Sequence, residues 1–347
     1  MKGFCMCLLC LLCIRASFCQ DTDSVKRSNK KYKPELSGFI QAHYLNEFNT
    51  NGDTLRDPDG FRILRVRLEV KGDVNKYVGY DVSIDPRAPE QGGILRDAFL
   101  VLHLLKDQDI RVGQQKTGFG WENSISSTKL YTVNRAEMSD AVSRGENLRD
   151  IGIGITGHIK LNDTWRIEDA VTLTNGTKFN VTGPYDFNTK KALWGRLGMR
   201  YKNEALQMRC GASFGYGGLR YLNDSLYNPN DDVYVDFWRI GADLEIEHDW
   251  FFLAGEWGMG EDMAADTLFD DPIGYQIELA AKTKWNCGPL VRYDVFQDEW
   301  KVWTFGAYYG KPKDPFRVLI NYIARGNIID QPGGHDDRLY IQMQVAF

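Results

Sequence analysis

Apolar and polar residues alternate along most of the chain, in segments of about ten residues with turn-forming residues between them. In residues 64–71, Leu and Val occupy one set of alternate positions, and Arg, Glu and Lys occupy the other. Successive side chains of a strand point to opposite faces, so this pattern predicts strands with one apolar and one polar face. It recurs in residues 206–214, 238–246 and 275–282. The chain is therefore expected to be all-β.

Short and long connections alternate between these segments. Short ones lie at residues 75–76, 107–108, 162–163 and 202–204, and long polar ones at 49–60, 86–93, 175–189, 217–232, 260–272 and 325–336. Outer-membrane barrels have tight periplasmic turns and larger external loops. We therefore predict a transmembrane antiparallel β-barrel of about 16 strands, with 14 as the alternative. A soluble β-sandwich is disfavoured, because it would rarely keep so many long strands with Trp and Tyr at their ends.

The last ten residues, 338–347, alternate to the end and finish on Phe347. A terminal aromatic on an alternating strand resembles the signal that the barrel-assembly machinery reads. An exposed edge with this apolar face would invite aggregation. We therefore expect this strand to close the barrel against residues 36–48.

Residues 117–149 form the longest connection, and a loop of this length is usually functional or disordered. It carries apolar residues that need packing partners: Phe119, Trp121, Ile125, Leu130, Tyr131, Val133 and Met138. We predict that this constriction loop folds into the barrel and narrows the pore. A short helix is expected around residues 134–143.

The N-terminus has the features of a cleaved export signal. Lys2 precedes an apolar run at residues 4–14, and the small residues Ser17 and Cys19 suit cleavage after Cys19. The apolar run is shorter than the roughly 20 residues that a membrane-spanning helix needs. A lipoprotein signal at Cys10 or Cys13 is disfavoured, because Leu-Leu and not small residues precede each of them. We expect a signal peptide at 1–19, a flexible periplasmic segment at 20–35 and the barrel at 36–347.

Charge and cysteine content exclude several classes of protein. Loss of the two basic residues in 1–19 leaves 40 basic against 47 acidic residues, a formal charge of −7 that argues against a nucleic-acid partner. Only Cys210 and Cys287 remain after cleavage, so the chain is not a disulfide scaffold. One bridge between them stays an alternative to two free thiols.

No pattern in the sequence points to catalysis or to a cofactor. The five histidines are scattered singly, and none has a metal-ligand spacing. We expect no catalytic residues, metal site or cofactor. A barrel hydrolase remains the alternative from a different functional class.

Several segments together resemble the phosphate-selective porin O and P family. They are residues 38–41, 61–68, 75–80, 110–114 with 116–120, and 148–153. The resemblance implies an outer-membrane porin: a 16-stranded, commonly trimeric barrel that forms a passive water-filled channel for small hydrophilic solutes or anions such as phosphate. The lipid bilayer and lipopolysaccharide would surround it.

The resemblance also implies a set of pore-lining or anion-binding residues. Wall candidates are Arg65, Arg67, Arg111 and Arg209, and loop candidates are Lys129, Arg135, Ser126 and Ser127. Guanidinium groups and hydroxyls suit phosphate oxygens. The inward faces also carry many acids, so pairing with carboxylates on neighbouring strands is the alternative for each arginine. A general porin, or one for cations or neutral solutes, therefore remains open.

Overall fold

A computed structural model describes most of the chain from residue 32 onward. The described residues are 32–48, 59–87, 94–143, 149–176, 190–221, 233–262, 271–297, 300–312, 314–327 and 337–347. Residues 34–347 form one compact unit. The expected signal peptide and nearly all of the segment at 20–35 lie outside the described residues.

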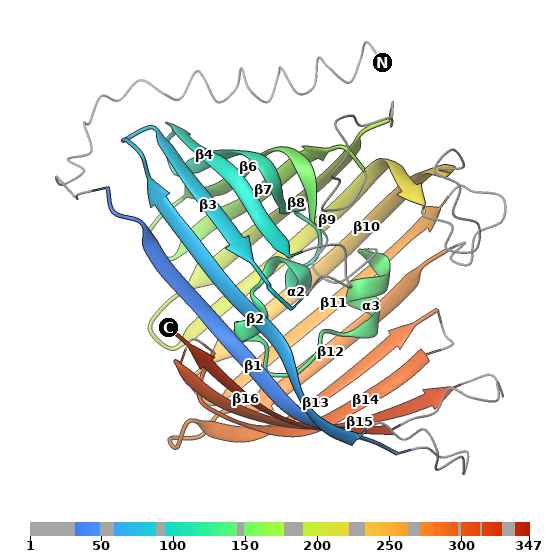
Figure 1. Ribbon diagram of the computed structural model, residues 1–347. Coiled ribbons are helices and arrows are strands. Elements are labelled where there is room, and N and C mark those ends of the chain that lie inside the picture. The colour runs from blue at the N-terminus through green and yellow to red at the C-terminus, as the bar shows by residue number, and fades with distance from the viewer. Residues whose placement is uncertain are drawn as a thin grey trace. The chain divides into compact units, whose positions relative to one another are not determined.

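The unit from residue 34 onward is a closed barrel of 16 antiparallel strands, each bonded to its neighbours in the sequence (Figure 1). The strands are β1 (Glu35–Phe48), β2 (Asp59–Asp73), β3 (Val78–Ile84), β4 (Leu95–Leu105), β5 (Gln108–Lys116), β6 (Arg149–Lys160), β7 (Trp165–Thr174), β8 (Ala192–Lys202), β9 (Leu206–Tyr221), β10 (Val233–His248), β11 (Phe251–Asp262), β12 (Ile273–Ala281), β13 (Cys287–Phe296), β14 (Trp300–Tyr309), β15 (Phe316–Asn327) and β16 (Asp337–Ala346). The prediction of 16 strands, rather than 14, is confirmed.

The first and last strands close the barrel. In their antiparallel register Phe39 pairs with Ala346 and Phe48 with Asp337. Gly38 and Phe347 extend the ladder through two backbone hydrogen bonds, with N···O distances of 2.9 and 3.0 Å. No edge of the sheet is left open, as predicted from the alternating C-terminal segment.

The two faces of the barrel differ in the way that the alternation predicts. The outward face exposes apolar side chains such as Leu197, Ile277 and Met343, each more than half exposed. The inward face carries polar ones such as Asn321 and Gln342, which are fully buried. This is the arrangement of a barrel whose outside meets lipid.

The two ends of the barrel differ in their connections. Turns at residues 74–77, 106–107, 161–164, 203–205, 249–250, 282–286 and 310–315 gather at one end, which we call the short-turn end. The connections at the opposite, long-connection end are longer, except for residues 297–299 between β13 and β14. Cys210 and Cys287 are both free.

Residues 117–143, the inner segment, lie inside the ring of strands (Figure 1). The segment contains α2 (Trp121–Ser124), the 3₁₀ turn η2 (Ser127–Lys129) and α3 (Glu137–Val142). It bonds to inward side chains of strands far apart around the wall: Gln41 of β1 donates to the Ser127 carbonyl, and Ser213 of β9 accepts from the Gly120 N–H. A segment that bonds to such distant strands of a closed cylinder has to lie within it. None of the described helices is long and apolar enough to cross a membrane.

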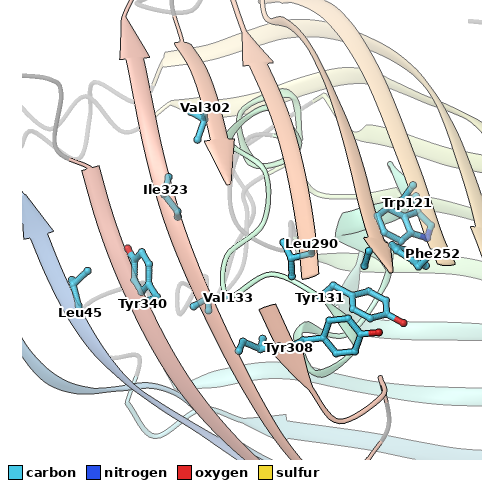
Figure 2. Close-up of a cluster of buried hydrophobic side chains, with 13 residues drawn as sticks. Leu45, Trp121, Tyr131, Val133, Phe252, Leu290, Val302, Tyr308, Ile323 and Tyr340 are labelled. Atoms are coloured by element: carbon cyan, nitrogen blue, oxygen red, sulfur yellow. The ribbon is translucent and has the colours of Figure 1, made fainter. Parts of the chain in front are cut away.

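An apolar cluster fixes the inner segment against one half of the inner wall (Figure 2). Tyr131 packs on Phe252 and Tyr308, with ring centroids 4.7 and 4.8 Å apart, and Trp121 packs on Phe252. Burial raises the pKa of the Tyr131 hydroxyl above its ordinary value, so this ring stays neutral in the cluster. A second cluster joins Phe119 and Met138 of the segment to wall residues such as Trp194.

Candidate functional site

Polar wall residues hold the backbone of the inner segment. The first turn of α3 has no side-chain cap from its own N-cap residue, Ala136. The Asp294 carboxylate of β13 takes that role: it accepts hydrogen bonds from the N–H groups of Glu137 and Met138, at 2.5 and 3.3 Å. A carboxylate at a helix N-terminus satisfies free N–H groups and complements the helix dipole.

Arginines of the wall bind carbonyl groups of the segment. Arg292 donates from Nη1 to the Asn134 carbonyl at 2.8 Å and to the Thr132 hydroxyl at 2.9 Å. Arg317 donates to the Thr128 carbonyl at 2.6 Å. Both arginines are almost fully buried. Their donors therefore position the segment and do not face the lumen.

Gly120 allows the segment to pass close to β11. It has a positive φ of 73°, and a Cβ placed there would lie 2.2 Å from Glu256 Oε1. The other Glu256 oxygen accepts the Glu122 N–H at 3.0 Å. Any larger residue at position 120 would both strain the backbone and displace the Glu256 carboxylate.

A polar cavity remains between the inner segment and the wall formed by β2 to β7, with a volume of about 260 Å³. Its charged lining residues are Glu69, Asp81, Asp97, Arg111, Lys116 and Arg149. Acidic and basic groups are equal in number here, so the cavity offers a mixed electrostatic surface to a solute. It is the candidate functional site.

The charged residues of the cavity differ in how far they are already paired. Arg149 forms a bidentate pair with Asp97, at 2.8 and 3.0 Å, and Lys116 donates to the carbonyls of Asn123 and Ile125. Arg111 lies over the Phe99 ring, 5.1 Å from its centroid, and has no ion pair with a described carboxylate. Arg111 is therefore the cavity cation that is best placed to meet a solute.

Two of the eight predicted residues lie at or beside this cavity. Arg111 lines it, and Arg67 lies 3.9 Å from the lining residue Asp97 and 5.8 Å from the Phe39 ring centroid. Arg209 of β9 does not line the cavity and pairs with Glu245 at 3.2 Å and with Glu168 at 3.7 Å. Arg67 and Arg209 thus follow the alternative expectation from the sequence, in which wall arginines pair with carboxylates of other strands.

Two more predicted arginines donate to carbonyls of the inner segment. Arg65 donates to the Val133 carbonyl and to Gln41, and the buried Arg135 donates to the carbonyls of Glu122 and Ile125. These donors hold the segment in its fold. They do not converge on the cavity.

The remaining three predicted residues are the N-cap of η2 and two residues of that turn. Ser126 caps this turn by accepting from the Thr128 N–H, Ser127 is buried, and Lys129 is exposed at its end. None of the three lines the cavity. The eight residues therefore do not form one site.

Sequence reasoning missed Lys116 and Arg149, which flank the inner segment. Both lie at the ends of strands, where β5 and β6 pair Lys116 with Arg149. The signal was present in the sequence, because a basic residue stands on each side of the longest connection. Their partners depend on the path of that connection, which alternation does not reveal.

The fold and the cavity together define a porin-type β-barrel: an apolar exterior, a polar interior and a segment folded into the lumen. Residues 35–184, from β1 past β7, match the family described as phosphate-selective porin O and P. The resemblance inferred from the sequence is confirmed over this part of the chain.

Solved structures of outer-membrane proteins share this fold. The outer-membrane channel DcaP of Acinetobacter baumannii is 16% identical, with a TM-score of 0.55 over 92% of this chain and 99% of that one. OmpF of Salmonella typhi, solved with daunomycin, is 13% identical, with a TM-score of 0.56 over 91% and 98%. The trimer form of OmpT of Vibrio cholerae is 11% identical, with a TM-score of 0.52 over 91% and 99%. Comparison with curated proteins gave no match.

Proposed function

We propose that the protein is a passive, water-filled channel through which small hydrophilic solutes cross the outer membrane. The observation that carries this proposal is the polar cavity that stays open between the inner segment and β2 to β7. A 16-stranded barrel is wide enough for an aqueous lumen, whereas eight strands enclose only side chains. In this proposal, residues 117–149 are the constriction loop, and the cavity is the path that it leaves.

The setting of the channel follows from the asymmetry of its ends. Short turns face the periplasm in barrels of this kind, and longer connections face outward, against lipopolysaccharide. We infer that residues 1–19 direct export and that the barrel-assembly machinery inserts the chain through its aromatic C-terminus. A homotrimer is supported by the trimer form of OmpT, which shares the fold.

A mild anion preference is the finer part of this proposal. Arg111 is supported by its lack of an ion pair with a described carboxylate, and Arg67 by its long contact of 3.9 Å with Asp97. Both guanidinium groups can replace part of the hydration of a passing anion. Weak contacts of this kind suit passage, because a tight site would trap the ion.

A channel without charge preference is the second candidate, and one observation favours it. Glu69 and Asp81 line the same cavity and have no ion pair with a described cation. Phosphate specificity draws less support from the geometry than a general anion preference, because Arg65 and Arg135 donate to the inner segment.

The described residues also contain no grouping of His, Cys, Asp and Glu that could hold a metal ion. We infer a non-enzymatic role.

Liposome swelling tests the proposed function. Purified protein in vesicles is expected to admit a small sugar rapidly and larger sugars progressively more slowly, because the solute must pass the cavity. A matched pair of solutes, one neutral and one anionic, then reports charge preference. Vesicles that stay impermeable to all of these solutes, while the barrel is shown to be folded and inserted, would exclude a channel.

A further inference from the structure

Accessible charges of opposite sign lie on different strands of the polar cavity. The carboxylates of Glu69 and Asp81 belong to β2 and β3, and the guanidinium of Arg111 belongs to β5. All three side chains are partly exposed, so a solute in the cavity can reach them. Phe99 of β4 stands between them: it pairs in register with Asp81, and its ring contacts Arg111. The cavity thus has an acidic edge and a basic edge, separated by an aromatic ring.

The other charged residues of the lining are engaged within the protein. Asp97 and Arg149 form their bidentate pair, and Lys116 donates to two carbonyls of the inner segment. The two acids and the arginine of the edges, in contrast, have no ion pair with a described residue. They are therefore the charged groups of the cavity that a solute can engage.

The nearest charged neighbours leave the two edges available. Lys71 stands opposite Asp81 in the register, but it is exposed and forms no ion pair with a described carboxylate. Asp109 lies two residues before Arg111 on the same face of β5, but its Oδ1 is 2.7 Å from Nδ1 of His103 and is engaged there. Neither neighbour neutralises the edge beside it.

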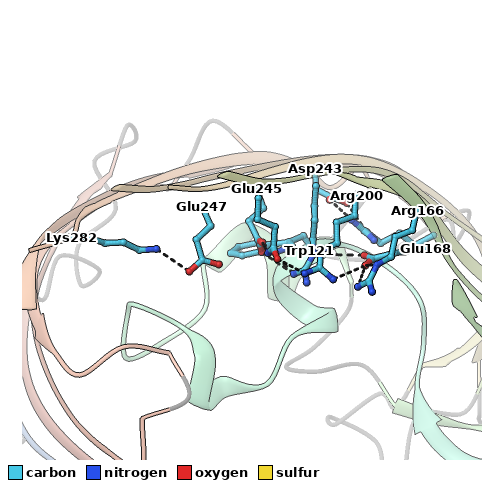
Figure 3. Close-up of polar contacts among 11 residues, drawn as sticks. Trp121, Arg166, Glu168, Arg200, Asp243, Glu245, Glu247 and Lys282 are labelled. Carbon is cyan, nitrogen blue, oxygen red and sulfur yellow. Dashed lines mark hydrogen bonds and ion pairs between the residues drawn. The ribbon is translucent and has the colours of Figure 1, made fainter. Parts of the chain in front are cut away.

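Charged groups elsewhere on the inner wall are arranged differently. On β7 to β9, Glu168 contacts Arg166, Arg200 and Arg209 (Figure 3). Glu245 of β10 contacts Arg209 at 3.2 Å. Acid and base neutralise each other locally in that part of the wall. At the polar cavity the opposite charges are held two strands apart instead, so both act on the space between them.

The spacing of the two edges suits a solute that carries its own pair of opposite charges. The strands β3 and β5 are roughly 10 Å apart, since neighbouring strands lie about 4.8 Å from each other. In an α-amino acid, two covalent bonds separate the ammonium nitrogen from the carboxyl carbon, a distance of about 2.5 Å. With a hydrogen bond of about 2.8 Å at each end, the molecule spans roughly 8 Å between its partners. It can therefore contact both edges at once.

We propose that the cavity favours small zwitterions, above all α-amino acids, with the ammonium group toward Glu69 and Asp81 and the carboxylate toward Arg111. This inference rests on the proposed channel function and names its solute class. A singly charged ion is attracted by one edge and repelled by the other, and a neutral solute gains from neither. Phe99, Ile155 and other apolar residues of the lining can contact the hydrocarbon part of the molecule. The contacts are few and exposed, which suits passage.

The test measures the entry of four labelled solutes into vesicles that contain the whole protein. L-Glutamine is the zwitterion, its N-acetyl derivative lacks the positive charge, and its α-carboxamide lacks the negative charge. The neutral sugar arabinose is the control for size. Glutamine is expected to enter about fivefold faster than arabinose and faster than either derivative, because a unit charge at about 4 Å changes occupancy about fivefold in water-like surroundings.

Two variants separate this site from a simple charge preference. Arg111→Gln and Asp81→Asn should each slow glutamine about fivefold relative to arabinose. Their effects on the derivatives should be opposite, because Arg111→Gln slows the anionic one and Asp81→Asn slows the cationic one. Lys284→Gln and Glu204→Gln, in exposed short turns, are the matched controls and should leave all ratios unchanged. The gel mobility shift between unheated and heated samples shows that each variant is folded.

Three results would overturn the proposal: glutamine no faster than arabinose in wild type, a glutamine preference that persists in either variant, or a variant that slows all four solutes equally. The last result would mean a narrower pore and no charge recognition. Vesicles that admit arabinose without favouring glutamine would exclude the zwitterion site and leave the channel standing. Vesicles that admit none of the four solutes would refute the channel itself.

Discussion

Arginines on the inner wall have different roles, and their local contacts decide which. Arg292 and Arg317 are almost fully buried and donate to the inner segment, so they are structural. Arg111 stacks on Phe99 beside an open cavity. All three occupy strand positions whose side chains, by alternation, point to the inside of the barrel. The position of a residue in the alternating pattern therefore predicts that its side chain points inward, but not whether a solute can reach it.

Arg111→Gln tests the role of the accessible arginine. We expect the ratio of anion to cation permeability to fall about two- to fivefold, since a unit charge about 4 Å from an ion is worth about 1 kcal/mol in water-like surroundings. Reversal potentials in a salt gradient measure this ratio. Lys284→Gln is the control: Lys284 lies in the turn at residues 282–286, over the Trp285 ring, and its loss should leave the ratio unchanged. An equal shift in both variants would contradict the assignment.

Gly120→Ala tests the close approach of the inner segment to β11. The added Cβ would meet Glu256 Oε1, and the positive φ of 73° is strained for alanine, which together should cost about 1–3 kcal/mol. We expect a lower unfolding temperature and noisier single-channel currents. Gly255→Ala is the control, at the β11 position next to Glu256. A Cβ at Gly255 would have only contacts of 3.6 Å or longer, so this variant should behave like wild type. Identical behaviour of the two variants would refute this account.

At the scale of elements, the strands are predictable from the sequence and the contacts of the inner segment are not. Each strand can be predicted from its own residues, because the alternation in segments such as 64–71 or 338–347 shows which side chains point outward and which point inward. The helix expected around residues 134–143 corresponds to α3, Glu137–Val142. The cap of α3, however, is Asp294, which lies more than 150 residues away in sequence. Such a partner depends on the closed register of the whole barrel.

Dependence on the register of the whole barrel also explains which residues of the candidate site could be predicted from the sequence. Arg67 and Arg111 could be predicted because inward parity and a basic side chain are visible in the sequence. Ser126 and Ser127 seemed suitable as phosphate ligands by residue type, but in the structure Ser126 caps the turn η2 and Ser127 is buried in it. The proximity of Arg166, Arg200 and Arg209 could not be predicted, because they become neighbours only through the pairing of three strands.

Asp294→Ala tests how α3 is held. Loss of the carboxylate leaves two N–H groups of the first helical turn unpaired, which should destabilise the segment by about 0.5–2 kcal/mol. We expect larger and more variable conductance steps, because the segment can leave its place on the wall. Asp294→Asn keeps an acceptor and should lie between alanine and wild type. Conductance steps that remain uniform and unchanged in Asp294→Ala would contradict this role.

At the scale of the whole molecule, the barrel has a polar interior and an apolar exterior. The exterior exposes residues such as Leu197 and Met343, while the interior buries arginines, carboxylates and amides. The apolar clusters on the inner segment fill one part of the lumen and leave the polar cavity beside β2 to β7. The fold is therefore suited to a lipid exterior and an aqueous path at the same time.

The central claim is that this path conducts, and recording from planar bilayers tests it most directly. Purified, refolded protein should insert in discrete steps of conductance that grow with salt concentration, and Arg111→Gln should change the ion preference of those steps. Insertion of a folded barrel without discrete conductance steps at any salt concentration would contradict the account.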